Sequence, residues 1–270
     1  MSSVIPNENI PDGIAVRGIV VSYPQSRQAV LVNQSVNLLP NKINVLIGPN
    51  GCGKSTFLKA MAGQLRLNKG AIYLQKEDIS TLTPLELARR AGILFQENFA
   101  PQDLTVEELV YYSRYPRLKF FESLSSADCD AVERAMKMTN TLQWRDKLIR
   151  ELSSGQRQLV WIALLLAQEP GYLFLDEPTT YLDMANQIEV LDCIRRLNRE
   201  WGATIVMSIH DLNMASLYSD WIIALKEGKV VSCGVAKDVI TPELVKSVFG
   251  VEVCVFQDDV GSVFCIPKRK

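Results

Sequence analysis

The chain has 270 residues, of which 47% are hydrophobic and 22% are charged, and its formal net charge is −1. These values are typical of an ordinary soluble globular protein that is long enough to form a substantial core. The near-neutral charge balance excludes an electrostatic argument for nucleic acid as the main partner.

Three further features of the sequence indicate a cytoplasmic protein. The six cysteines are scattered without a C-x-x-C pair, which suits free thiols in a reducing compartment better than disulfides or zinc. Residues 1–13 lack the basic and apolar regions of a signal peptide. The longest apolar run, Leu159 to Ala167, is far shorter than the roughly 20 residues that span a bilayer.

The first part of the chain alternates between strand and helix patterns. Residues 14–39 alternate apolar and polar and are broken by Pro24-Gln25-Ser26, which predicts two antiparallel strands. Further along we expect a strand at Ile43–Ile47, a helix running to about Leu65, a turn at Asn68–Gly70, a strand at Ala71–Leu74, a helix capped by Thr83-Pro84, and a strand at Gly92–Gln96.

The loop after the strand Ile43–Ile47 carries the strongest functional signal. It fits the pattern G-x-x-x-x-G-K-[ST] between a strand and a helix, and its residues are Gly48, Pro49, Asn50, Gly51, Cys52, Gly53, Lys54, Ser55 and Thr56. Glycines let backbone N–H groups surround a polyphosphate, and the helix adds the positive end of its dipole. Lys54 can reach the β- and γ-phosphates, and the Ser55 hydroxyl can bind Mg²⁺. The loop therefore predicts a nucleoside triphosphate site.

The pattern changes between Glu97 and about Ser154. Thr105 and Glu108 form a capping box, and Ser126–Asn140 and Leu142–Ile149 have helical patterns, whereas no strand is convincing. We therefore expect an all-helical subdomain inserted into an α/β domain. Beyond it we expect a helix at Gln158–Gln168, a strand at Tyr172–Leu175, a helix at Met184–Trp201, a strand at Thr204–Ser208, a helix at Leu212–Tyr218, a hairpin turning at Glu227-Gly228, a helix capped by Thr241 and short closing strands.

Two further motifs have chemical meaning. The strand Tyr172–Leu175 delivers Asp176 and Glu177 at its carboxyl end, where Asp176 can hold Mg²⁺ and Glu177 can polarise an attacking water. Residues 152–156, Leu-Ser-Ser-Gly-Gln, precede an apolar helix, and their backbone donors could form a second anion site or could cap the helix.

Together these motifs resemble those of ATP-binding cassette (ABC) proteins. Residues 152–156 resemble the signature motif, with Ser154 where the family usually has Gly. Gln96 matches the Q-loop glutamine, Thr180–Asp183 resembles the D-loop, and His210 matches the switch histidine. Tyr23 lies where the family places an aromatic residue for adenine stacking. The resemblance covers about residues 14–240.

The resemblance implies roles for these residues, with ATP and Mg²⁺ as ligands. The implied catalytic residues are Glu177, His210, Lys54 and Gln96. The implied metal ligands are Ser55, Gln96 and Asp176. The implied nucleotide-binding residues are Tyr23, residues 48–56, Ser153, Ser154, Gly155, Gln156 and Asp183.

It also implies an architecture: one ABC ATPase domain over residues 1–270, with a P-loop NTPase core at 14–96 and 155–240, an antiparallel β subdomain, a helical subdomain at 97–154 and an extension at 241–270. Two copies would pair head to tail around ATP. A separate integral membrane permease would bind near Gln96, on the inner face of the cell membrane, and would work with a substrate-binding protein.

The local sequence resembles one importer class, and alternatives remain open. The P-loop, Thr179-Thr180 before Tyr181–Asp183, and Ser113–Pro116 resemble ATPase subunits for ferric siderophores, haem and cobalamin, and among these we favour iron–siderophore uptake. The alternatives are another ABC importer, an exporter subunit, and a soluble ABC ATPase of translation or DNA repair. A single cassette without a long coiled coil argues against the soluble proteins.

Two surface segments admit more than one interpretation. Residues 111–120 interleave aromatic and basic side chains, which favours a permease-facing or solvated surface over a nucleic-acid site because the net charge is near zero. The stretch from Val251 to the basic end Lys268–Lys270 could be a regulatory or dimer-contact extension, but edge strands with a solvated tail fit it better.

Overall fold

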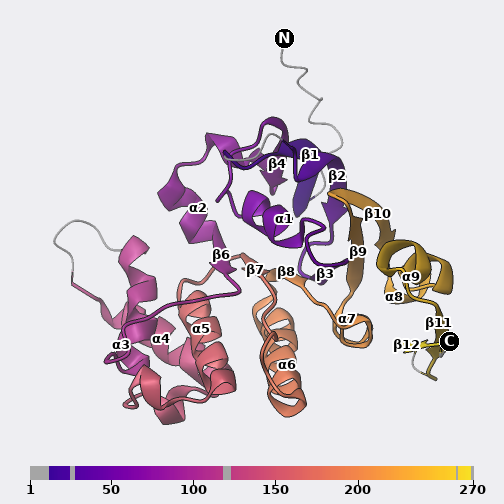
Figure 1. Cartoon of the computed structure of the whole chain (residues 1–270). Coiled ribbons are helices and arrows are strands. Elements are labelled where there is room, and N and C mark those ends of the chain that lie inside the picture. The colour runs from indigo at the N-terminus through magenta and orange to yellow at the C-terminus, as the bar shows by residue number, and fades with distance from the viewer. Residues whose placement is uncertain (1–11, 25–27, 118–122, 260, 269–270) are drawn as a thin grey trace. The chain divides into compact units, whose positions relative to one another are not determined.

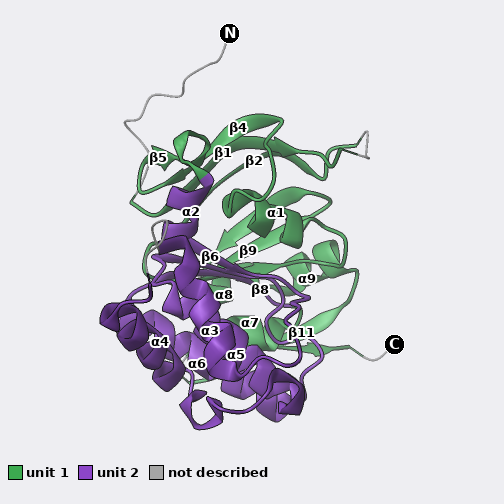
Figure 2. Cartoon of the chain, turned by 90° about the vertical axis from the view of Figure 1, so that its left-hand side faces the viewer, with its two compact units in different colours: residues 1–83, 210–270 green, residues 84–209 purple. Residues whose placement is uncertain are grey.

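The computed structural model describes residues 12–24, 28–117, 123–259 and 261–268. The chain forms two compact units, coloured separately in Figure 2. Unit 1 consists of residues 1–83 and 210–270, and unit 2 consists of residues 84–209. Unit 2 therefore interrupts unit 1 along the chain.

Unit 1 begins with a four-stranded antiparallel sheet (Figure 1). Its strand order is β2-β1-β4-β5, with bounds Ile14–Val21 (β1), Leu31–Leu38 (β2), Lys69–Leu74 (β4) and Glu77–Asp78 (β5). The predicted antiparallel pair at residues 14–39 is confirmed, because β1 and β2 pair from Ile14–Leu38 to Val21–Leu31. The apolar side chains of β1 that the pattern predicted inside are buried, such as Ile14 and Ile19.

A second group of strands in unit 1 carries the glycine-rich loop. Its order is β10-β9-β3, with bounds Lys229–Gly234 (β10), Trp221–Lys226 (β9) and Ile43–Ile47 (β3). β3 is buried along its whole length and runs parallel to β9, whereas β9 and β10 are antiparallel. This arrangement confirms the predicted strand at Ile43–Ile47 and the predicted hairpin turn at Glu227-Gly228.

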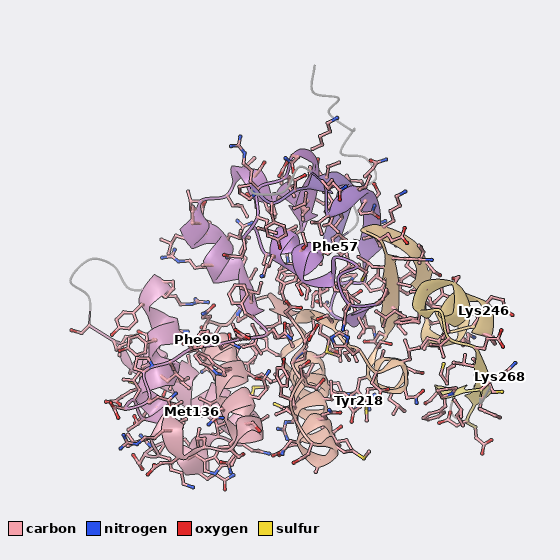
Figure 3. All side chains as sticks on the ribbon, viewed as in Figure 1. Phe57, Phe99, Met136, Tyr218, Lys246 and Lys268 are labelled. Carbon is pink, nitrogen blue, oxygen red and sulfur yellow. The ribbon has the colours of Figure 1, made fainter. Side chains whose placement is uncertain are left out.

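Helix α1 (Lys54–Met61) follows the loop and ends four residues before the predicted Leu65. The amide of Gly63 donates to Ala60 O and that of Gln64 donates to Lys59 O. These bonds satisfy the last carbonyls of the helix and stop it there. Phe57, labelled in Figure 3, is fully buried on α1.

The C-terminal part of unit 1 adds short elements after residue 210. They are α7 (Leu212–Tyr218), α8 (Ala236–Val239), α9 (Pro242–Phe249), β11 (Val253–Gln257) and β12 (Val263–Pro267), and η2 (Ile79–Thr81) precedes unit 2. β11 and β12 pair as an antiparallel hairpin, which confirms the predicted closing strands. The side chain of Thr241 accepts from Leu244 N and caps α9 as predicted.

Unit 2 is built on three parallel strands. Their order is β8-β7-β6, with bounds Thr204–Ser208 (β8), Tyr172–Leu175 (β7) and Ala91–Leu94 (β6). β7 and β8 are buried throughout, as their continuous apolar runs predict for parallel strands. The other elements that the structure describes in this unit are helices: α2 (Pro84–Arg90), α3 (Val106–Tyr111), η3 (Tyr112–Arg117), α4 (Ser126–Met138), η4 (Leu142–Trp144), η5 (Ile149–Glu151), α5 (Ser154–Ala167) and α6 (Met184–Trp201).

The predicted helix at Leu142–Ile149 is wrong. The chain makes only the short 3₁₀ turns η4 and η5 there. The carbonyls of Arg145 and Lys147 accept from Glu107 N and Val106 N, in the first turn of α3. In an α-helix Ile149 N would donate to Arg145 O, but here Ile149 N donates to Leu104 O at 2.9 Å. The segment therefore pairs with residues 104–107 instead of forming helical hydrogen bonds of its own.

Several predicted boundaries are shifted by a few residues. β4 begins at Lys69, so the turn predicted at Asn68–Gly70 is already strand, and β6 ends at Leu94 rather than Gln96. α4 ends at Met138 rather than Asn140. α5 begins at Ser154 rather than Gln158, because Ser153 and Gln156 form a reciprocal capping box.

Two basic residues of the segment 111–120, Arg114 and Arg117, do not form a solvated charge cluster. Arg114 is 5% exposed, and its guanidinium contacts Asp128 Oδ1 at 2.8 Å and Glu169 Oε2 at 3.2 Å. Arg117 donates to Gln168 O at 3.1 Å. These charges hold η3, α4 and the end of α5 together, which removes them from any nucleic-acid surface.

Some predictions fall on residues outside the described ranges: residues 1–11, Gln25 and Ser26, Leu118–Phe120, and Arg269 and Lys270. Within the described parts of the chain, no helix is long and apolar enough to cross a membrane.

Candidate functional site

In unit 1, the glycine-rich loop leads from the end of β3 into α1 with a backbone that only glycine adopts easily. Gly48 has φ +151° and Gly53, the N-cap of α1, has φ +106°. A Cβ at Gly48 would lie 2.3 Å from Leu225 O and 2.7 Å from Cys52 Sγ. The first turn of α1 carries no acidic residue. The loop therefore presents a helix N-terminus suited to an anion.

Lys54 lies with its charge over this loop. The side chain is only 5% exposed, and Nζ donates to Gly48 O at 2.8 Å and to Pro49 O at 3.2 Å. Cys52 is buried beside it, and burial raises the pKa of its thiol although the Lys54 charge opposes that shift. The ammonium is thus held by two backbone carbonyls of the glycine-rich loop.

Tyr23 and His210 also belong to unit 1. The Tyr23 hydroxyl lies 3.1 Å from Thr56 Oγ1, which ties the aromatic ring to the first turn of α1. His210 is exposed and immediately precedes Asp211, the N-cap residue of α7. The structure therefore brings Tyr23 to the loop and places His210 at the start of a helix.

In unit 2, Asp176 and Glu177 follow β7. Asp176 is 3% exposed, and its Oδ1 accepts from Ser208 Oγ at 2.9 Å. The Glu177 amide donates to the same Ser208 Oγ at 2.8 Å, and Glu177 has φ +51°, which is uncommon for a residue with a side chain. Ser208 thus fixes both acidic residues at the end of the strand.

The Glu177 carboxylate is held by two side chains. Gln96 Nε2 donates to Glu177 Oε2 at 2.9 Å, and Thr180 Oγ1 donates to the same oxygen at 3.0 Å. The structure therefore joins Gln96, which lies beyond the end of β6, to the acidic pair. The sequence placed Thr180 only in the segment that resembles the D-loop, without a role of its own, and gave Ser208 no role. The available signal for Ser208 was its position as a polar residue at the end of a predicted apolar strand.

Residues 153–156 form the start of α5. Ser153 Oγ accepts from Gln156 N at 3.3 Å, and Gln156 Oε1 accepts from Ser153 N at 3.1 Å. Ser154 is exposed, whereas Gly155 is buried where a Cβ would lie 2.5 Å from Asn186 Oδ1. Residues 153 and 156 thus cap α5 reciprocally, and the exposed Ser154 leaves the anion-site interpretation open.

Asp183 is also a capping residue. It is the N-cap of α6, and it accepts from Asn186 N at 2.9 Å through Oδ1.

Comparison with known proteins decides the family. The sequence profile of the ABC transporter family matches residues 31–180, which include the glycine-rich loop and the acidic pair. The chain belongs to the ABC transporter family. As an ABC ATPase, it binds and hydrolyses ATP.

Two relatives of this ABC protein align over most of both chains. It is 43% identical over 231 residues to the iron(3+)-hydroxamate import ATP-binding protein of Bacillus subtilis (strain 168), with 86% of each chain covered. It is 39% identical over 253 residues to the ferric enterobactin transport ATP-binding protein of Escherichia coli (strain K12), with 93% of each chain covered.

The fold agrees with these matches. A solved structure of a metal-chelate type ABC transporter in an inward-facing conformation superposes with a TM-score of 0.82 at 25% identity. It covers 96% of this chain and 99% of the other. The predicted P-loop NTPase fold class is thereby confirmed.

Each unit contains groups whose chemistry fits a nucleotide with Mg²⁺. Unit 1 contains the glycine-rich loop with the Ser55 hydroxyl, and unit 2 contains the carboxylates of Asp176 and Glu177. Carboxylate and hydroxyl oxygens are hard donors of the kind that Mg²⁺ prefers, and Mg²⁺ usually adds phosphate oxygens to one or two protein ligands.

Proposed function

We propose that the chain is the ATPase subunit of an importer for ferric siderophores. The support is that its two relatives named above are ATP-binding proteins of ferric hydroxamate and ferric enterobactin transport, each aligned over most of its length. The subunit would be cytoplasmic and would bind to the inner face of the cell membrane through a separate permease, which in turn works with a substrate-binding protein.

The chemical part of the proposal rests on the Glu177 carboxylate. Hydrogen bonds from Gln96 and Thr180 engage one of its oxygens, and that orientation suits a group that positions the attacking water. Mg²⁺, when bound, would neutralise charge on the phosphates. Lys54 would bind the phosphates, Tyr23 would stack on adenine, and His210 would contact the γ-phosphate.

A head-to-tail pair would complete two sites. The N-terminus of α5, with Ser154 exposed, would bind ATP held by the loop of the second copy, and Asp183 would lie at the same interface. The chain is proposed as one ABC ATPase domain with its core at 14–96 and 155–240, a helical subdomain at 97–154 and an extension at 241–270. The change from parallel strands to helices after β6 supports this division.

The first test is Glu177→Gln. We expect steady-state ATP hydrolysis to fall by about 10²–10⁴-fold, because a catalytic base is lost, and an ATP-bound dimer to accumulate. Size-exclusion chromatography with MgATP would detect the dimer. The control is Glu200→Gln on the exposed end of α6, which should behave as wild type. Hydrolysis by Glu177→Gln near the wild-type rate would disprove the role of Glu177.

The second test addresses transport. Tagged Glu177→Gln would be purified with MgATP from detergent-solubilised membranes, and the proteins that co-purify would be identified. A polytopic permease is the expected partner. Uptake of radioactive ferric siderophore would then be compared between cells with and without this chain, and loss of uptake in the cells without it would identify the substrate. Recovery of a haem, cobalamin or other solute permease would replace the siderophore. Recovery of ribosomes or DNA-repair factors would disprove import and leave the ATPase activity intact.

A further inference from the structure

We propose that the C-terminal hairpin β11–β12 holds α7 in place and thereby positions His210 for ATP hydrolysis, with Asn213 as the positioning residue. The proposal rests on the proposed role of His210. It gives a function to the last segment of the chain, whose strands lie beside α9 in Figure 1.

The contacts between the hairpin and α7 are specific. Asn213, in the first turn of α7, uses both ends of its amide: Oδ1 accepts from Cys265 N at 2.7 Å and Nδ2 donates to Cys265 O at 3.4 Å. One turn further, Ser216 Oγ accepts from Val263 N at 2.9 Å in a buried position. Two side chains of α7 thus satisfy backbone groups of β12, as a neighbouring strand would.

The hairpin has an anchored structure of its own. The side chains of Val253, Val263 and Cys265 are at most 9% exposed, and β12 packs against α7. α9 packs against β11, and the Lys268 amide donates to Glu252 O at 2.9 Å at the open end of the hairpin. Lys246 on α9 forms an ion pair with Glu252 at 2.7 Å. The segment is therefore more than a pair of edge strands.

A short path leads from these contacts to His210. Asp211, the next residue, caps α7: its Oδ1 accepts from Asn213 N at 2.7 Å and from Met214 N at 3.0 Å. The Asn213 residue therefore contacts the Asp211 cap through its backbone and the hairpin through its side chain. Burial raises the pKa of the Cys265 thiol, and the Asp211 charge adds to the shift, which agrees with close packing of the cap on the hairpin.

His210 lies at a boundary between the two units. Unit 2 ends at Ile209, and unit 1 resumes along the chain with His210, directly before α7. α7 has only seven residues and packs on β3, α8 and β12. Without the β12 contacts, the start of α7 would be fixed less firmly, and so would the orientation of His210.

This mechanism predicts an effect on turnover rather than on ATP binding. The loop and Tyr23 would bind the nucleotide, whereas His210 would act on the γ-phosphate during hydrolysis. We therefore expect Asn213→Ala to lower kcat by about three- to tenfold and to leave KM for ATP within about twofold. Ser216→Ala, which removes the acceptor for Val263 N, should act in the same direction.

The control separates positioning from simple loss of stability. Asn198 on α6 makes a comparable bond, with Nδ2 donating to Ala203 O at 2.8 Å, and it lies in unit 2. Asn198→Ala should lower the melting temperature about as much as Asn213→Ala but leave kcat unchanged. The decisive measurement is single-turnover ATP hydrolysis by purified His210→Ala with and without Asn213→Ala, where the second change should cause no further loss.

The outcomes are distinct. If Asn213→Ala and Ser216→Ala behave like Asn198→Ala while His210→Ala is slow, the hairpin does not position His210 and the proposed ATPase mechanism stands. The same conclusion follows if Asn213→Ala lowers the rate equally in the presence and absence of His210. If His210→Ala hydrolyses ATP at the wild-type rate, the role of His210 is wrong and the positioning proposal falls with it.

Discussion

Gly228 provides the sharpest test of how the glycine-rich loop is held. It lies in the β9–β10 turn with φ +71°, and its amide donates to Cys52 O, inside the loop, at 2.9 Å. A Cβ at this position would lie 2.0 Å from Val30 O. Gly228→Ala must therefore displace either the turn or residue 30. Displacement of the turn would disturb the hydrogen bond from Gly228 N to Cys52 O.

Two other glycines serve as references for the loss of stability expected from Gly228→Ala. Gly202 (φ +69°) and Gly250 (φ +73°) have nearly the same backbone conformation, but a Cβ there would meet nothing within 4 Å. Alanine at these two positions should cost only the left-handed conformation, about 1–2 kcal/mol. At Gly228 the clash should add about 1–3 kcal/mol, by analogy with overpacking of a core.

The assay compares the three alanine variants by urea unfolding and by titration with a fluorescent ATP analogue. We expect Gly228→Ala to lose the most stability and to be the one of the three with weakened nucleotide binding, because Cys52 belongs to the loop. Gly202→Ala and Gly250→Ala should bind nucleotide as wild type. Equal stability losses and equal affinities in all three variants would refute the reasoning.

Three further predictions concern single side chains. Hydrogen bonds from Ser125, and then from Arg114, lower the pKa of Asp128 to about 2. The stabilisation that they give is therefore present above about pH 4 and is lost as the pH falls towards 2. Asp128→Asn should lower the free energy of unfolding at pH 7 by about 1–2 kcal/mol, and by progressively less below pH 4. Tyr23→Ala should weaken ATP binding by about 1–3 kcal/mol through loss of stacking, measured by calorimetry, and an unchanged affinity would exclude stacking. Burial raises the pKa of the Cys193 thiol to about 11, so a thiol reagent at pH 8 should label Cys193 only after unfolding, whereas exposed Cys129 should react at once.

The elements that the sequence predicted correctly are those whose signals are local. β3, β7, β8, α6 and α7 have the predicted bounds, because continuous apolar runs and helical periodicity are written into consecutive residues. The capping box of Thr105 and Glu108 was also predicted, since its partners are three residues apart. The Leu142–Ile149 helix failed because its competing partner, the start of α3, lies about 40 residues away along the chain.

The residues of the candidate site likewise fall into those with a local signal in the sequence and those without one. The glycine-rich loop could be identified from chemistry alone, since nine consecutive residues carry the whole motif. Gln96 and His210 have no local signal and were assigned only through resemblance to ABC proteins. The structure adds the bond from Gln96 to Glu177, 81 residues apart, and the bonds from Ser208 to both acidic residues. No pattern in the sequence predicts these pairings.

The sequence by itself therefore determined that this chain is a P-loop ATPase of the ABC family, because phosphate binding needs a fixed run of residue types between one strand and one helix. Only the tertiary structure decided how Glu177 is held and how the end of the chain meets α7. Both depend on side chains distant in sequence: Asn213 and Cys265 are 52 residues apart, and their hydrogen bonds exist only after folding has brought α7 and β12 together.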